Sequence, residues 1–259
     1  MNRRDFIKSG YLITGGAFIS SCTPFHDFWA GKLYPNQVKG LSLWLRADKG
    51  VVLSGSAVTQ WQDQSGNGNH ASPGVVAPTL VSNGLNRLPV INFTGTASEG
   101  FIIPDHASYK SSTIHLFIVC RSTAIMRTII GYPQASGAHI ADWFRWSFYH
   151  AVTNEIDLRI DVEQVVTAPN ANWANHSIYS YSNGSGRVVH VNGQYFNYSL
   201  GRSITYTGAD LRIGMNGAGA ENMVGDIAEI VLYNRALSER QRIGVELYLS
   251  EKYAIPLSA

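Results

Sequence analysis

Residues 225–238 read Gly-Asp-Ile-Ala-Glu-Ile-Val-Leu-Tyr-Asn-Arg-Ala-Leu-Ser and run directly into the one helix that the sequence clearly predicts. The apolar and β-branched residues between 226 and 233 are typical of a strand. Ser238 follows, and Gln241 stands three positions after it, which is the pattern of a capping box at a helix start. We expect this helix to continue to about Tyr253 and to pack on a sheet.

Short apolar or alternating runs recur along the chain between clusters of Gly, Asn, Ser and Pro. This spacing is typical of a sandwich or barrel and not of alternating strand–helix units. Asn192-Gly193 between two such runs predicts a hairpin with a type I′ turn. The predicted strands lie near residues 41–46, 89–93, 114–121, 143–150, 155–162, 176–182, 187–192, 210–214 and 226–233.

The composition describes a chain that can build a large core but carries few charges. Of 259 residues, 45% are hydrophobic and only 15% are charged, below the roughly 25% of an average soluble protein. Residues 22–259 hold equal numbers of acidic and basic residues. Such a chain has no electrostatic footprint for DNA or RNA, so nucleic acid is not an expected partner.

The N-terminus has the features of an export signal. Arg3 and Arg4 precede Phe-Ile-Lys and an apolar run that is shorter than the roughly 20 residues needed to span a bilayer. The pattern resembles a twin-arginine signal, and the following Ile-Ser-Ser before Cys22 resembles a bacterial lipobox. The resemblance implies that Cys22 carries lipid and anchors the protein to a membrane. An ordinary cleavage site with an incidental cysteine is the alternative.

These features divide the chain into three expected parts. Residues 1–21 form a twin-arginine lipoprotein signal peptide, residues 22–38 a lipidated N-terminus and tether, and residues 39–259 a single domain. The expected location is the cell envelope, as a membrane-anchored lipoprotein that faces the periplasm or the exterior. Cys120 is the only cysteine after Cys22 and lies in a predicted strand, so no disulfide within the domain is expected.

Four segments together resemble the concanavalin A-like lectin and glucanase superfamily, in particular its laminin-G-like domains. The resemblance implies a two-sheet antiparallel jelly-roll β-sandwich with one short C-terminal helix, and it covers residues 40–255. One departure is Ala228, which stands where the family often has an Asp before the Glu. The segments are 43–48 with 58–70 (which contains Trp-Gln-Asp-Gln-Ser-Gly-Asn-Gly), 173–181, 191–193, and 211–214 with 225–238.

The superfamily contains lectins, glycan-binding modules, adhesive domains and β-glucanases, so the fold does not decide the function. The glucanases carry Glu-x-Asp-x-x-Glu on one strand. Here Glu155 and Asp157 match the first two positions, but Ile160 stands at the third. A retaining mechanism needs two carboxyl groups about 5–5.5 Å apart, so this chain departs from the catalytic pattern. A half-exposed strand with a charged outer face explains the alternation more simply.

Two neighbouring predicted strands, near 143–150 and 155–162, combine aromatic and charged residues. If they pair, one face of the sheet carries side chains that suit a sugar, because aromatic rings stack on apolar sugar faces while charged groups bond to hydroxyls. The alternative is that the aromatic residues only cover the sheet or contact the tether. The candidate ligand-binding residues are Trp143, Arg145, Tyr149, Glu155, Asp157 and Arg159.

A weak calcium signal lies in residues 63–69, where oxygen-bearing side chains stand at every second position. The twelfth position is Gly74 and not the Glu of a calcium loop, and such clusters are also ordinary turn formers. The candidate calcium ligands are Asp63, Asn67 and, near the closing strand, Asp226. Calcium is the one cofactor that the sequence suggests.

The combined patterns favour a non-catalytic, lipid-anchored extracytoplasmic binding module for carbohydrate. Its expected partners are a glycan or another cell-surface ligand and, through the lipid anchor, a membrane. The alternative is a structural or adhesive module that binds a protein partner, and a glycoside hydrolase with a different acid pair is the third reading.

Overall fold

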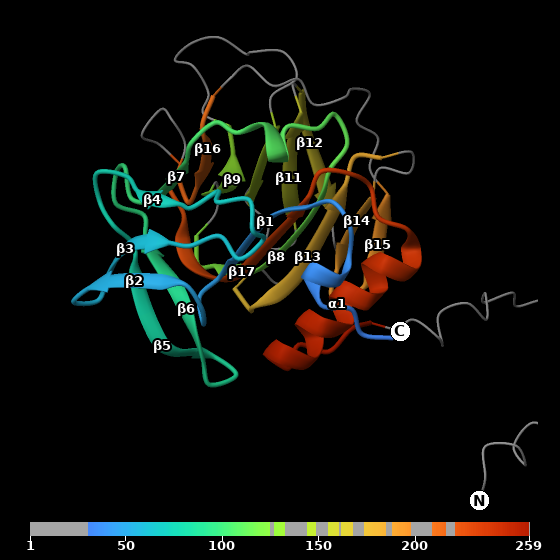
Figure 1. Ribbon diagram of the computed structural model, residues 1–259, viewed down its shortest axis with the longest axis horizontal. Helices are drawn as coiled ribbons and strands as arrows, with labels where there is room; N and C mark the ends of the chain where they lie inside the picture. The colour runs from blue at the N-terminus through green and yellow to red at the C-terminus, as the bar shows by residue number, and fades with distance from the viewer. Residues whose placement is uncertain are drawn as a thin grey trace, which may run out of the picture.

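The computed structural model describes residues 31–124, 127–132, 144–148, 155–160, 162–167, 174–184, 188–197, 209–215 and 221–258. Two antiparallel sheets pack face to face, and one helix lies on the outside (Figure 1). The predicted β-sandwich with a single C-terminal helix is therefore confirmed.

In the described part of the chain the larger sheet has ten strands. They run in the order β15-β14-β13-β8-β17-β6-β5-β3-β2, and β1 pairs with β17 beside this path. Strands far apart in the sequence thus lie side by side, as in Greek-key sandwiches. The strands are β1 (Leu41–Arg46), β2 (Val51–Ser54), β3 (Ala57–Trp61), β5 (Thr79–Leu85), β6 (Leu88–Thr94), β8 (His115–Ser122), β13 (Ser177–Ser182), β14 (Val188–Val191), β15 (Gln194–Asn197) and β17 (Val224–Tyr233).

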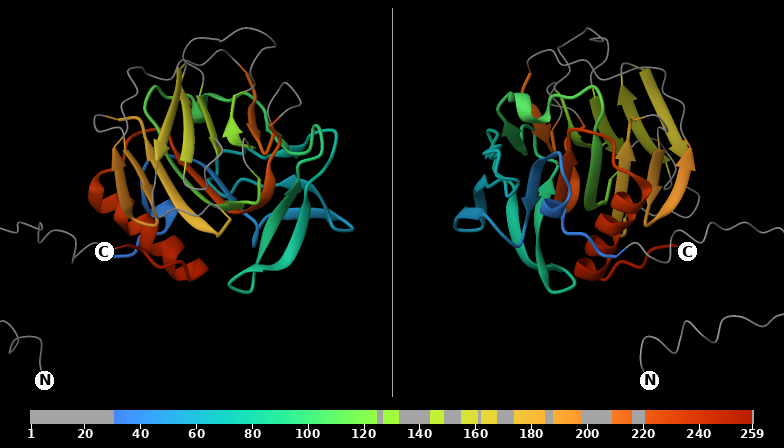
Figure 2. Two further views of the ribbon diagram at one scale, coloured as in Figure 1. Left: turned by 180° about the vertical axis from the view of Figure 1, so that it is seen from behind. Right: turned by 45° about the vertical axis from the view of Figure 1, so that its right-hand side comes forward.

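The smaller sheet has seven strands among the described residues, in the order β12-β11-β10-β9-β16-β7-β4. Figure 2 shows both sheets from two further sides. Its strands are β4 (Ser72–Pro73), β7 (Phe101–Ile103), β9 (Arg127–Gly131), β10 (Phe144–Phe148), β11 (Glu155–Ile160), β12 (Val162–Thr167) and β16 (Leu211–Ile213).

The central strands of the larger sheet, β13, β8 and β17, are buried on both faces. The inner face of this sheet packs with the smaller sheet around Trp61, Phe93 and Phe101. Its outer face packs against the helix α1 (Glu239–Tyr253), with Phe117 of β8 among the residues at that contact. A strand that is covered on both sides has no polar face to show, which explains the nearly continuous apolar run of β17.

Two local signals in the sequence form as predicted. Ser238 caps α1 by accepting a hydrogen bond from the Gln241 backbone amide, and the helix ends at Tyr253. Asn192 and Gly193 both adopt positive φ, at 49° and 81°, between β14 and β15. Because a type I′ turn requires this conformation at both central positions, Asn-Gly fixes the register of the hairpin.

Residues 31–38, here called the N-terminal strap, lie along α1 and contain a short 3-10 helix, Pro35–Gln37. The Leu33 amide donates to the Gly244 carbonyl at 2.9 Å. The rings of Tyr34 and Tyr248 lie 5.2 Å apart. The last residues of the predicted tether are thus packed on the domain. Within the described residues, no helix is long and apolar enough to cross a membrane.

Candidate functional site

The strands that were predicted to carry a ligand face are paired. β10 and β11 run antiparallel, and the register places Arg145 opposite Arg159 and Ser147 opposite Asp157. Glu155 lies at the start of β11, opposite Thr167 of β12. The other two candidates, Trp143 and Tyr149, lie outside the described residues. A ligand-binding role for these six residues stays a prediction.

The Asp63 carboxylate organises the corner that was considered as a calcium loop. Its Oδ1 accepts hydrogen bonds from the backbone amides of Trp44 and Ser65, both at 2.9 Å. Its Oδ2 accepts from the Ser65 hydroxyl at 2.7 Å and from the Asn69 amide at 3.0 Å. Asn67 donates its side-chain amide to the Leu41 carbonyl at 3.0 Å. These bonds fasten the corner to β1.

Asp226, the third candidate calcium ligand, is buried in the larger sheet. It accepts hydrogen bonds from Asn92 of β6 at 2.7 Å and from Arg121 of β8 at 2.5 Å. It therefore connects the two strands that flank β17. The described residues contain no group of three or more His, Cys, Asp or Glu side chains arranged to hold a metal ion. Calcium binding stays a prediction.

The buried Glu229 carboxylate on β17 accepts hydrogen bonds from side chains of two other elements, β1 and α1. It accepts hydrogen bonds from the indole of Trp44 at 2.6 Å, from the Tyr253 hydroxyl at 2.8 Å and from the Lys252 ammonium at 2.6 Å. Burial and the negative charge of Glu229 raise the pKa of Tyr253 well above its usual value. This cluster joins β1, β17 and α1, which makes its role structural.

Lys252 extends the same cluster to Asp48, which lies 2.8 Å away and is also paired with Arg46. Burial disfavours the charged form of Asp48, but hydrogen bonds from Arg46 and Lys252 outweigh it and lower the pKa to about 2. All these charges are matched by protein partners, so the cluster offers little to a ligand.

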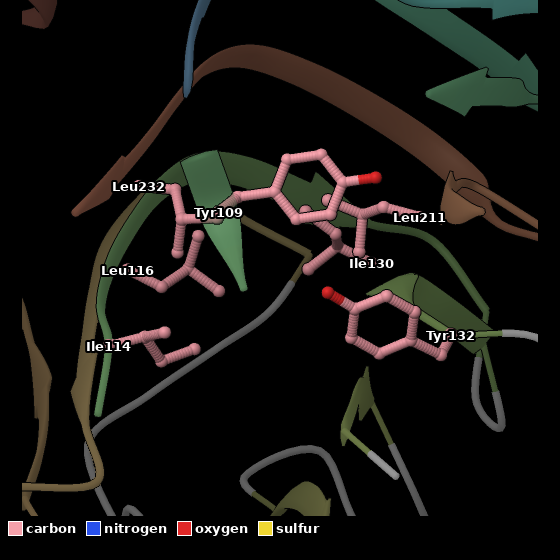
Figure 3. A pocket seen from close by; sticks show the side chains of 7 residues that line it. All are labelled: Tyr109, Ile114, Leu116, Ile130, Tyr132, Leu211 and Leu232. Atoms are coloured by element: carbon pink, nitrogen blue, oxygen red, sulfur yellow. The ribbon is translucent and has the colours of Figure 1, made fainter. Parts of the chain in front are cut away.

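An enclosed cavity lies inside the sandwich core, between side chains of both sheets (Figure 3). Its volume is about 10 Å³, which is room for no more than about one water molecule. Its lining is almost entirely apolar, so it is a gap in core packing and not a ligand site. The lining residues are Tyr109, Ile114, Leu116, Ile130, Tyr132, Leu211 and Leu232.

A more open depression lies between α1 and the β14–β15 hairpin, which run beside each other in Figures 1 and 2. We call it the helix–hairpin groove. Its volume of about 530 Å³ falls within the range of small-molecule sites. It is lined by Val188, His190, Gly193, Tyr195, Glu239, Arg242, Ile243, Glu246, Leu257 and Ser258.

The floor of the groove is an ionic group on α1, in which Arg242 and Glu246 are buried and Glu239 is exposed. Arg242 donates one hydrogen bond to Glu246, at 2.5 Å, and two to Glu239. The three residues meet because positions three and four apart share one face of a helix. Burial raises the pKa of Glu246, whereas the hydrogen bond from Arg242 lowers the pKa of Glu239.

Two buried polar atoms of the groove have no hydrogen-bond partner among the described residues: Oε1 of Glu246 and Nδ1 of His190. Glu246 is only 1% exposed and His190 only 4%. Burial and the nearby Arg242 charge lower the pKa of His190 to about 4, so its ring is neutral at pH 7. Buried polar atoms are nearly always hydrogen-bonded, so two such atoms just below the surface of one depression are candidates to bond to a polar ligand or water after a small side-chain movement.

An exposed aromatic ring stands at the rim of the same groove. Tyr195 on β15 is 55% exposed and lies 5.6 Å from the His190 ring, edge to face. An open aromatic face beside buried hydrogen-bonding atoms is the usual composition of a sugar site. The groove was not predicted from the sequence. The elements that carry these residues were predicted: His190 and Tyr195 lie on either side of the predicted Asn192-Gly193 turn, and Glu239 begins the predicted helix. Only the fold brings the two elements together.

The solved structures with a similar fold include domains of two enzymes that were solved with a carbohydrate bound. Domain 4 of AbnA, an extracellular arabinanase of Geobacillus stearothermophilus solved with arabinotriose, is 14% identical, with a TM-score of 0.57. The match covers 80% of this chain and 97% of that domain. Trypanosoma rangeli sialidase in complex with sialic acid is 14% identical, with a TM-score of 0.58. This match covers 83% of this chain and 33% of the sialidase.

The likeness shows a shared β-sandwich fold. This chain corresponds to about a third of the length of the sialidase, so the activity of the whole enzyme does not carry over. No protein-family model matches the chain, and no curated protein matches it either.

Proposed function

We propose that this protein is a non-catalytic carbohydrate-binding module that is held at the cell envelope by a lipid on Cys22. The observation that carries the proposal is the helix–hairpin groove, where the exposed ring of Tyr195 stands beside the unpartnered buried atoms of His190 and Glu246. A pyranose or furanose ring has an apolar face for the tyrosine and hydroxyl groups for the two polar atoms.

Two further observations support the carbohydrate class. The AbnA domain with the same fold was solved with arabinotriose, and the sialidase with sialic acid. The superfamily that the sequence resembles contains lectins and glycan-binding modules. A jelly-roll sandwich hosts many functions, however, so the groove and not the fold carries the proposal.

The absence of catalysis is part of the proposal because the strand β11 departs from the glucanase pattern. Glu155 and Asp157 occupy its first two acidic positions, but Ile160 occupies the third. Export by the twin-arginine signal with Arg3 and Arg4 and anchoring through Cys22 complete the proposal, and they would present the module outside the cytoplasm.

The test is a glycan array followed by titration calorimetry on the purified protein, with calcium and again with a chelator. We expect at least one oligosaccharide to bind. Tyr195→Ala should weaken that binding about tenfold, since stacking on an aromatic ring contributes roughly 1.4 kcal/mol. Tyr34→Ala is the matched control, because Tyr34 is an exposed tyrosine on the strap and outside the groove.

Three outcomes would count against parts of the proposal. A folded protein that binds no saccharide would contradict carbohydrate binding and favour a protein partner. Equal losses for Tyr195→Ala and Tyr34→Ala would contradict the groove as the site. Release of reducing ends that Glu155→Gln abolishes would contradict the absence of catalysis. Binding that is lost in chelator would support a calcium site at Asp63, Asn67 or Asp226.

A further inference from the structure

The charge arrangement of the helix–hairpin groove restricts the class of sugar that it can accept. Among the described lining residues, Arg242 is the only permanent cation. Its guanidinium already bonds to Glu239 on one side and to Glu246 on the other, and its side chain is 6% exposed. An acidic ligand would therefore find no free cation and would have to displace a carboxylate of the protein.

The orphan atom of Glu246 adds a second restriction. Glu246 lines the groove, its Oε2 bonds to Arg242, and its Oε1 lies below the groove surface with almost no exposed area, near the Ser180 hydroxyl. A ligand hydroxyl reaches Oε1 only if the side chain turns towards the groove, whereas the negative charge acts across the groove in either position. A carboxylate oxygen accepts hydrogen bonds and repels other anions, and the repulsion is strong where water is partly excluded. The neutral ring of His190 does not offset this charge. A hydroxyl group is the ligand donor that suits both atoms.

We propose that the groove selects uncharged saccharides, whose hydroxyl groups donate to Glu246 and bond to His190, and rejects sugars that carry a carboxylate, such as sialic and uronic acids. This inference rests on the proposed function, because it names the ligand class of the same site.

The experiment compares matched pairs that differ only in the carboxylate: carboxyl-reduced 3′-sialyllactose with 3′-sialyllactose, galactotriose with trigalacturonate, and cellotriose with its uronic counterpart. Calorimetry gives Kd for each member with the purified protein at pH 7. We expect binding of at least one neutral member, with the acidic member of that pair about tenfold weaker or more, because like charges at a binding site cost affinity.

Two variants test whether the groove causes the discrimination. Glu246→Gln keeps the shape and an acceptor oxygen but removes the charge, and Glu239→Gln frees one side of Arg242 at an exposed position. Each should bring the acidic-to-neutral Kd ratio about tenfold closer to one. Glu239→Gln keeps the test decisive if Glu246→Gln does not fold, because the Glu239 side chain is 65% exposed. Glu251→Gln is the control, since Glu251 is an exposed glutamate of α1 that does not line the groove.

The outcomes separate this inference from the function on which it rests. Binding of none of the saccharides overturns both. Binding of an acidic member as tightly as its neutral partner overturns the selectivity and leaves carbohydrate binding in place. A ratio that changes equally in Glu251→Gln overturns the assignment to the groove, because the net charge of the protein would then explain it.

Discussion

At the scale of single residues, Glu229 is a buried carboxylate that connects three elements, β1, β17 and α1. Its carboxylate is fully buried and bonds to Trp44 of β1 and to Lys252 and Tyr253 of α1. Removing one partner from a buried charged group costs more than the group contributes when complete, because the remaining donors and the Lys252 charge stay buried without compensation.

We therefore expect Glu229→Ala to lower the free energy of unfolding by about 3–5 kcal/mol. Urea denaturation followed by tryptophan fluorescence measures this. Glu251→Ala is the control and should change nothing measurable, because Glu251 pairs with Lys32 at the exposed surface. A loss for Glu229→Ala as small as that of the control would show that the carboxylate is not needed to hold β1, β17 and α1 together.

At the scale of elements, the layer between α1 and the larger sheet contains two buried histidines. His115 on β8 bonds through Nε2 to the Ser180 hydroxyl at 2.9 Å, and burial, helped by the Arg242 charge, lowers its pKa to about 3. The pKa of His190 on β14 is lowered to about 4 by burial and by Arg242, against an opposing effect of Glu239. Both values lie below the usual 6.5 of an unfolded histidine.

The free energy of unfolding should therefore decrease as the pH is lowered. Above about pH 6.5 both histidines are neutral in the folded and unfolded states, so this stability is fully present. Between about pH 6.5 and 4 the two histidines bind protons in the unfolded chain but stay neutral in the folded protein. In this range each of the two histidines lowers the free energy of unfolding by about 1.4 kcal/mol for each unit by which the pH falls. His176 contributes in the same direction, because burial also lowers its pKa.

Urea midpoints at pH 7, 6, 5 and 4.5 measure this slope. His115→Gln should reduce it by about one proton. A slope that His115→Gln does not alter would show that His115 titrates normally in the folded protein.

Elements with a strong local signal could be predicted from the sequence. β1 and α1 lie at the predicted residues, because Leu41–Arg46 is a compact apolar run and Ser238 with Gln241 caps the helix. Several other strands were not predicted, among them β2, β3, β4, β5, β7 and β9. β5 has a largely exposed pattern around Ser-Asn-Gly, and β7 has three residues, so the neighbouring strands and not the local sequence set them.

The candidate site was also difficult to predict from the sequence, because it is formed by segments that lie far apart in the chain. The pairing of the strands near 143–150 and 155–162 entered the prediction only as a condition, and alternation alone does not give the register that places Arg145 opposite Arg159. The groove joins residues about 190 and 240, which touch only because α1 folds back across the larger sheet. No period within one segment signals such a contact, since it depends on the whole topology.

At the scale of the whole molecule, the groove and the strap lie on different sides of α1. Glu239, Arg242 and Glu246 face the groove. Gly244 and Glu251 face the strap and lie on roughly the opposite side of a helix with 3.6 residues per turn. A chain anchored through its N-terminus would therefore turn the strap towards the membrane and leave the groove open to ligands.

The anchor itself is testable in cells. Cys22→Ser removes the thiol that would carry the lipid, so we expect the variant to leave the membrane fraction, whereas the wild type stays there through a carbonate wash and is released by detergent. Cys120→Ser is the matched control. Cys120 is fully buried, so it cannot receive a lipid, and this variant should stay with the membrane. The chain between Cys22 and Gly31 spans at most about 30 Å when extended, which keeps the domain close to the bilayer. If Cys22→Ser remains in the membrane fraction, the protein is held there by some other contact, and the inferred orientation of the groove no longer follows.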